Sequence, residues 1–95
     1  MPIHILVPGA GSGPGNSLIR SLRSGDSSLV IVGCHDDRFV LRKSTADRNY
    51  LVPPRGHARH STALRRIIRR EKVDLLIPNT DDEVARVSSL WASVA

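Results

Sequence analysis

The sequence contains few aromatic residues, one cysteine and no long apolar run. Its three aromatics, Phe39, Tyr50 and Trp91, are too few to stack the bases of single-stranded nucleic acid. Cys34 has no second cysteine for an internal disulfide, as is usual in a reducing compartment. The first apolar run, 3–7, is too short to span a membrane and lacks the basic lead of a signal peptide. We therefore expect a cytoplasmic protein with no membrane partner.

The length and composition predict one small folded domain, 1–95, with a single core. Hydrophobic residues make up 40% of the chain and charged residues 24%. Fourteen basic residues against nine acidic ones give a net charge of +5, which favours acidic ligands. The most basic patch, the arginines of 58–71, alternates with an apolar stripe, so a solvated helix face explains it and nucleic-acid binding is not expected.

Four short apolar segments predict strands, most of them buried on both faces as a parallel sheet requires: 3–7, 29–33, 49–52 and 74–78. Helical patterns lie between and after them: a helix capped by Asn16 or Ser17 and running to about Ser24, a short turn within 38–48, a helix over 58–71, and a last helix capped by Thr80 or Asp81. This order predicts an α/β fold, a Rossmann-like three-layer sandwich with a four-stranded parallel sheet.

The stretch 9–15, Gly-Ala-Gly-Ser-Gly-Pro-Gly, joins the first strand to the first helix. Backbone N–H groups and the positive end of a helix dipole at such a loop can bind an anion. The loop is not a Walker phosphate loop, because Gly15 is followed by Asn16. It also misses the dinucleotide fingerprint, because Pro14 or Asn16 stands where the third glycine belongs. Two interpretations stay open: the loop contacts a phosphate or carboxylate group, or it packs the helix on the sheet.

Acidic residues follow the second strand. Asp36 lies about 20 residues beyond the glycine loop, which is the spacing of a ribose-binding carboxylate in dinucleotide folds. In this alternative interpretation the chain is a small NAD(P)-binding module that uses Gly9, Gly15 and Asp36. The same carboxylate could equally be a solvated turn residue. Cys34, His35 and Asp36 are adjacent and point to opposite faces, so we expect no metal site, and we assign no catalytic residue.

Three stretches, in this order and at this spacing, resemble a known family: Ile5-Leu6-Val7-Pro8-Gly9-Ala10-Gly11-Ser12-Gly13-Pro14-Gly15, Ala46-Asp47-Arg48-Asn49-Tyr50-Leu51-Val52-Pro53-Pro54 and Asp74-Leu75-Leu76-Ile77-Pro78-Asn79-Thr80-Asp81-Asp82-Glu83. The chain resembles the N-terminal pre-ATP-grasp domain of the ATP-grasp superfamily, particularly proteins similar to the carbamoyl-phosphate synthase large subunit. The resemblance covers essentially the whole chain.

The resemblance implies a domain that packs against an ATP-binding module and lines the substrate cleft of a carboxylate–amine ligase. Such enzymes phosphorylate a carboxylate with ATP and Mg²⁺, and a nucleophile such as an amine then displaces the phosphate. The matching substrate-binding positions are Gly11, Ser12, Gly13, Thr80, Asp81 and Glu83. The lysines and magnesium ligands of the ATP-binding module have no counterpart in these residues. We therefore expect the N-terminal part of a longer ligase, with the module in cis or in trans and with no cofactor and no catalysis in this chain alone.

A further alternative is an interaction domain. The predicted last helix carries an apolar stripe that includes Leu90, Trp91 and Val94 and shows no C-cap signal. The predicted sheet has exposed edges as well. Docking through the last helix, or a homodimer formed through a sheet edge or that helix, would cover these surfaces.

Overall fold

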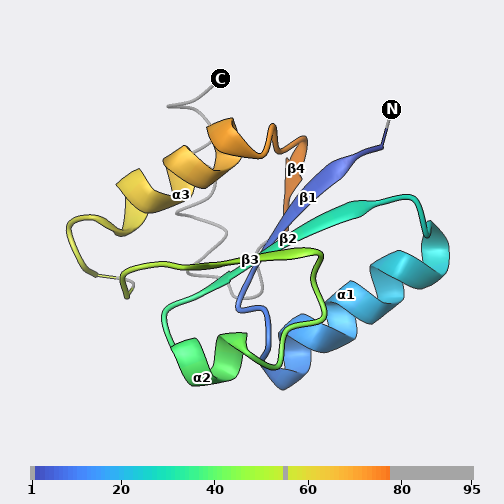
Figure 1. The fold of residues 1–95 in the computed structure, drawn as a ribbon, viewed down its shortest axis with the longest axis horizontal. Helices are drawn as coiled ribbons and strands as arrows, with labels where there is room; N and C mark the ends of the chain where they lie inside the picture. The colour runs from blue at the N-terminus through green and yellow to red at the C-terminus, as the bar shows by residue number, and fades with distance from the viewer. Residues whose placement is uncertain (1, 55, 78–95) are drawn as a thin grey trace.

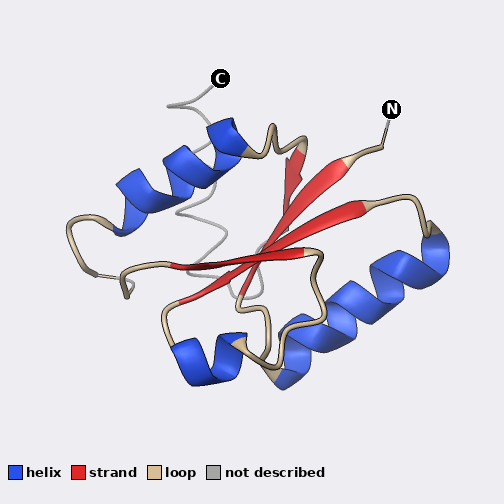
Figure 2. Ribbon diagram, viewed as in Figure 1, coloured by secondary structure: helices blue, strands red, loops and turns tan. Residues whose placement is uncertain are grey.

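In a computed structural model, the structure describes residues 2–54 and 56–77. Strands and helices alternate along this part of the chain, as the apolar patterns predict (Figures 1 and 2). In chain order the elements are β1 (His4–Pro8), α1 (Gly13–Gly25), β2 (Val30–His35), α2 (Arg38–Leu41), β3 (Arg48–Leu51), α3 (His60–Arg70) and β4 (Leu75–Leu76). The predicted last helix, with Thr80, Asp81, Glu83, Leu90, Trp91 and Val94, lies outside the described residues.

The four strands form one sheet in the order β3-β2-β1-β4, and every neighbouring pair is parallel. In the register, Leu6 is opposite Val32 on one side and Leu76 on the other. Because β2 and β3 lie on one side of β1 and β4 on the other, the strand order reverses at β1. The carboxyl edge beside β1 is therefore the switch point at which open α/β sheets bind ligands.

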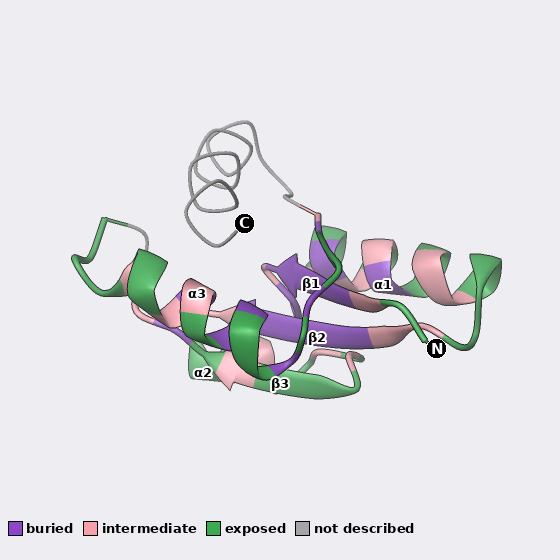
Figure 3. Ribbon diagram, turned by 90° about the horizontal axis from the view of Figure 1, so that it is seen from above, coloured by how far each residue is buried: buried purple, intermediate pink, exposed green. Residues whose placement is uncertain are grey.

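Helices cover both faces of the sheet, which makes the α/β sandwich three-layered. Alternate strand residues divide the core in two, because successive side chains of a strand point to opposite faces. On one face Leu6, Val32 and Cys34 pack against α3, and on the other Ile5 and Val7 pack against α1. Figure 3 shows the buried residues of β1 and β2 as the middle layer. The fold class predicted from the sequence is confirmed.

The N-terminus of α1 differs from the prediction. Ser12, rather than Asn16 or Ser17, caps the helix: its hydroxyl accepts a hydrogen bond from the N–H of Gly15 at 3.1 Å. Pro14 fits the first turn, where a missing N–H leaves no hydrogen bond unmade. The helix therefore begins within the glycine-rich stretch. Glycine content hides this start, because it lowers the apparent helix propensity of the first turn.

The sheet also depends on polar contacts at its borders. Asp47, at the turn before β3, accepts a hydrogen bond from the backbone N–H of Ile31 at 2.8 Å and forms an ion pair with Arg23 of α1 at 3.2 Å. These contacts join the start of β3 to both β2 and α1. Within the described residues, no helix is both long enough and apolar enough to cross a membrane.

Candidate functional site

The candidate site lies at the carboxyl edge of the sheet, where the glycine loop leaves β1. The loop binds to the end of β2: the N–H groups of Gly9 and Ala10 both donate to the carbonyl of Cys34, at 2.8 and 3.2 Å. It also closes on itself, because the Ser12 hydroxyl donates to the carbonyl of Gly9 at 2.6 Å and the Ser12 N–H donates to the same oxygen at 3.2 Å. Most donors of the loop are therefore satisfied within the protein.

Helix α2 and the residues after it cover the middle of the loop. Gly11 has a φ of +97°, and a Cβ built on it would lie 1.9 Å from the carbonyl oxygen of Val40. Asn16 connects the two segments: its side chain accepts from the N–H of Gly11 at 3.2 Å and donates to the carbonyl of Lys43 at 2.9 Å. Gly11 is consequently buried, and its lack of a side chain lets α2 approach.

Gly15 has a similar packing role. A Cβ built on it would lie 2.2 Å from the carbonyl oxygen of Gly9, so the first turn of α1 can sit against the loop only with glycine there. Of the two interpretations that the sequence leaves open, these contacts explain Gly11 and Gly15 by packing. The cofactor interpretation requires Gly9 and Gly15 to face a pyrophosphate, yet the Gly9 N–H bonds to Cys34 and the Gly15 N–H bonds to Ser12.

Gly13 is the loop residue that remains open to a ligand. It is exposed, and a Cβ built on it would meet no atom within 4 Å. Within residues 9–13, its N–H is the backbone donor for which the structure shows no hydrogen bond. It lies in the first turn of a 13-residue helix that has no acidic residue in that turn, so the positive end of the dipole is not neutralised there. This N–H can therefore donate to an anion.

The two aspartates after β2 have different roles. Asp37 caps α2: its carboxylate accepts from the N–H of Phe39 at 2.8 Å and from that of Val40 at 3.3 Å. Asp36 instead has Oδ1 at 3.1 Å from His35 Nδ1, the nitrogen that accepts the Asp37 N–H at 2.9 Å, and keeps part of its carboxylate in solvent. The structure thus gives Asp37 a local structural role and leaves Asp36 as the carboxylate that a ligand could reach.

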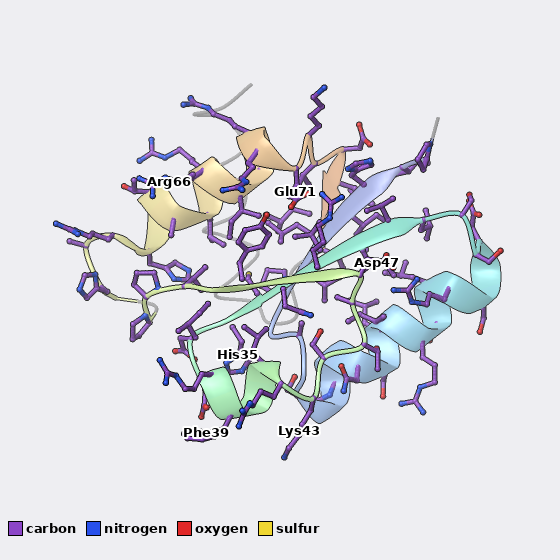
Figure 4. All side chains as sticks on the ribbon, viewed as in Figure 1. His35, Phe39, Lys43, Asp47, Arg66 and Glu71 are labelled. Atoms are coloured by element: carbon purple, nitrogen blue, oxygen red, sulfur yellow. The ribbon has the colours of Figure 1, made fainter. Side chains whose placement is uncertain are left out.

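A shallow depression of about 670 Å³ lies beside these aspartates, lined by Asp36, Asp37, Arg38, Phe39 and Leu51. Its lining combines two apolar side chains, Phe39 at 67% exposed and Leu51 at 53% exposed, with charged ones. Figure 4 shows Phe39 on the outer side of α2, away from the sheet. The depression lies at the carboxyl ends of β2 and β3, next to the helix that covers the glycine loop.

The end of β4 meets the glycine loop at this same edge. Ile77, the last described residue, donates its backbone N–H to the carbonyl of Leu6 at 3.1 Å, two residues before β1 ends at Pro8. β4 is thus the neighbour of β1 on the side away from β2. The substrate-binding candidates Thr80, Asp81 and Glu83 follow in the sequence but lie outside the described residues.

Metal-ligating side chains do not gather in the described part of the chain, where no group of three His, Cys, Asp or Glu residues is placed to hold an ion. Two of its histidines contact backbone carbonyls instead: His4 Nδ1 lies 2.6 Å from the oxygen of Glu71, and His60 Nδ1 lies 2.7 Å from that of Pro53. Cys34 is buried under α3. These side chains therefore stabilise the fold.

A polar cluster at the opposite edge of the sheet was not predicted from the sequence. Glu71 lies at the end of α3 (Figure 4) and is 4% exposed. It accepts a hydrogen bond from the Tyr50 hydroxyl and forms an ion pair with Arg48 Nη1 at 2.5 Å. The hydrogen bond from Tyr50, followed by the contact with Arg48, lowers the pKa of the Glu71 carboxyl, although burial opposes this. The same hydrogen bond, with burial, raises the pKa of the Tyr50 phenol. The cluster ties α3 to β3.

One sequence signal could have revealed half of this cluster. Arg48 and Tyr50 are two residues apart on one strand, so their side chains share a face. Nothing local indicates that Glu71, 21 residues beyond Tyr50, returns to that face.

Comparisons with protein-family models, curated proteins and solved structures found no match.

Proposed function

We propose that this chain is the N-terminal, substrate-side domain of an ATP-grasp carboxylate–amine ligase similar to carbamoyl-phosphate synthase. The observation that supports it is the pairing of β1 with β4, which brings the glycine loop and the start of the segment holding Thr80, Asp81 and Glu83 to one edge of the sheet. That edge is the switch point of the fold. Two of the three stretches that carry the family resemblance meet there.

In this proposal the Gly13 N–H is the donor that binds a carboxylate oxygen of the substrate. An N–H in the first turn of a helix stabilises negative charge through its own hydrogen bond and through the helix dipole. Gly11 and Ser12 then act indirectly. Gly11 admits α2, and Ser12 holds the turn in which Gly13 points to solvent. Thr80, Asp81 and Glu83 complete the proposed substrate side.

In the described residues no group of metal ligands is placed to hold Mg²⁺, and Lys43 and Lys72 lie in no phosphate-binding motif for ATP. Binding of both groups, and the chemistry that follows, is assigned to an ATP-grasp module in cis or in trans. The role of this chain is to bind and orient a small carboxylate.

An NMR titration of the 95-residue chain tests the assignment of Gly13. Bicarbonate, glutamate and citrate serve as carboxylate probes. We expect at least one of them to shift the amide signals of Ser12 and Gly13 in a saturable way. Gly13→Pro removes the N–H, and the extended backbone of Ser12, with φ −72° and ψ 163°, suits a following proline. Gly13→Ala is the matched control, because it keeps the N–H and meets no neighbouring atom.

Gly13→Pro loses a hydrogen bond to a charged group, so its affinity for the carboxylate should fall about tenfold or more. Gly13→Ala should bind like the unaltered chain. Equal affinity of both variants would contradict the role of Gly13. The observation that favours the alternative, a dinucleotide-binding module, is the exposed carboxylate of Asp36 beside the depression. A saturable response to NAD or NADP at millimolar concentration that Asp36→Asn weakens would support this module instead.

A further inference from the structure

Positively charged side chains cluster on the outer face of α3, where they do not pack on the sheet. Four arginines and a threonine line a depression of about 550 Å³ on this helix: Thr62, Arg65, Arg66, Arg69 and Arg70. Figure 4 shows Arg66 projecting from α3 away from the strands. Packing on the sheet is done by the opposite face of the helix, through Leu64, Ile67 and Ile68. The arginine side chains therefore take no part in this packing and can contact a ligand.

These guanidinium groups have no acidic partner among the residues that the structure describes. The ion pairs there involve Arg23, His35 and Arg48, and α3 itself contains no acidic residue. Arg70 lies near enough to Glu71 to affect its pKa, but that carboxylate already binds Tyr50 and Arg48. Among the described residues, the positive charge on the outer face of α3 is thus left without an acidic partner.

The spacing of the arginines works against the helix. Arg65 with Arg69, and Arg66 with Arg70, are pairs of like charges four residues apart, an arrangement that destabilises helices. The dipole favours basic residues in the last turn, which accounts for Arg69 and Arg70 but leaves Arg65 and Arg66 unexplained. An anion bound between the four side chains would remove the repulsion.

We propose that this face of α3 binds the polyphosphate group of a small ligand. Its side chains offer donors and positive charge without an acidic acceptor, and guanidinium groups match phosphate oxygens in a two-pronged geometry. Four positive charges suit a di- or triphosphate better than a singly charged carboxylate.

A small ligand fits this face better than nucleic acid does. From Thr62 to Arg70 the helix extends about 12 Å, which is short for a protein–DNA interface. Arg20 and Arg42 do not extend the patch, because they belong to α1 and to the residue after α2, on the opposite face of the sheet from α3. For the same reason this site is separate from the glycine loop and does not depend on the ligase proposal.

Calorimetric titration of the full chain at about 0.15 M salt, where exposed charges are screened beyond about 8 Å, tests the proposal. The probes are inorganic phosphate, pyrophosphate and tripolyphosphate, with a 12-base-pair DNA duplex as the competing class. We expect one saturable site whose affinity rises from phosphate to tripolyphosphate. Arg66→Gln with Arg69→Gln should weaken tripolyphosphate binding about tenfold or more. Glutamine keeps a high helix propensity, so this variant should fold.

Two further variants separate a built site from general charge. Arg20→Gln with Arg42→Gln makes the same change of net charge away from α3 and should alter the affinity less than twofold. Arg66→Lys with Arg69→Lys keeps the charge but loses the two-pronged geometry. Its affinity for tripolyphosphate should lie between those of the parent and of Arg66→Gln with Arg69→Gln. Equal losses in the two glutamine variants, or no saturable binding, would overturn the proposal. Tighter binding of the duplex than of tripolyphosphate, lost in Arg66→Gln with Arg69→Gln, would replace it with a nucleic-acid surface.

Discussion

Replacement of Gly11 by alanine should strongly destabilise the protein. The φ of +97° places Gly11 in a region that costs an alanine about 1–2 kcal/mol. The new Cβ would also lie 1.9 Å from the backbone oxygen of Val40, so α2 must move. Overpacking of this kind costs a further ~1–3 kcal/mol. The expected loss in the free energy of unfolding is therefore about 2–5 kcal/mol.

Gly13→Ala is the control for this prediction. It lies two residues away on the same loop, in the first turn of α1, and its Cβ would meet no atom within 4 Å. Its loss in stability should be smaller than that of Gly11→Ala, because no other segment packs on Gly13. The gain from a more restricted unfolded chain is opposed by Pro14, which disfavours helical backbone in a preceding residue that has a Cβ. Urea denaturation followed by circular dichroism measures both. Free energies of unfolding within about 0.5 kcal/mol of each other would refute the claim that α2 covers Gly11.

Other substitutions test the aspartates and the buried cluster. Asp37→Ala removes the cap of α2 and should lower the free energy of unfolding, measured in urea, by about 1 kcal/mol. Asp36→Ala should change it by no more than about 0.5 kcal/mol. Equal losses in the two variants would contradict the roles assigned to these aspartates. Glu71→Gln should cost about 1–3 kcal/mol near pH 7, because the carboxylate accepts from both Tyr50 and Arg48. Because folding lowers the pKa of Glu71, the stability that its carboxylate contributes is present above the ordinary carboxyl pKa of 4.5 and is lost as the pH falls through the lowered pKa. A difference in the free energy of unfolding between Glu71→Gln and the parent that stays constant from pH 6 to pH 3 would argue against this. Folding raises the pKa of Tyr50, so the stability lost in Tyr50→Phe should be constant below pH 10 and shrink above it, as ultraviolet-monitored denaturation at increasing pH can show.

The sheet could be predicted from the sequence because its signals are local. Buried parallel strands are continuous apolar runs, and the two central ones, β1 and β2, appear within one or two residues of the expected limits. The amphipathic pattern of α3 was equally visible, although the helix begins at His60 rather than at residue 58.

The details of the site were harder to predict because they depend on contacts between distant residues. Glycine, serine and proline are typical of a loop, so the sequence did not show that Ser12 starts a helix with Pro14 in its first turn. The contact of α2 with Gly11 joins residues about 30 positions apart, and no local pattern indicates it. The buried position of Glu71 has the same cause, since it is set by the path of α3 across β3.

The most direct test of the proposed function is an assay of carboxylate-dependent ADP release. The coding sequence beyond Ala95 and its neighbouring reading frames identify the candidate module, and the assay uses this chain together with it, in cis or in trans. The account predicts ADP release that requires the module, a carboxylate and an amine, and that falls about tenfold or more in Gly13→Pro but not in Gly13→Ala. The absence of any encoded ATP-grasp module, or ADP release that is the same with and without this chain, would contradict it.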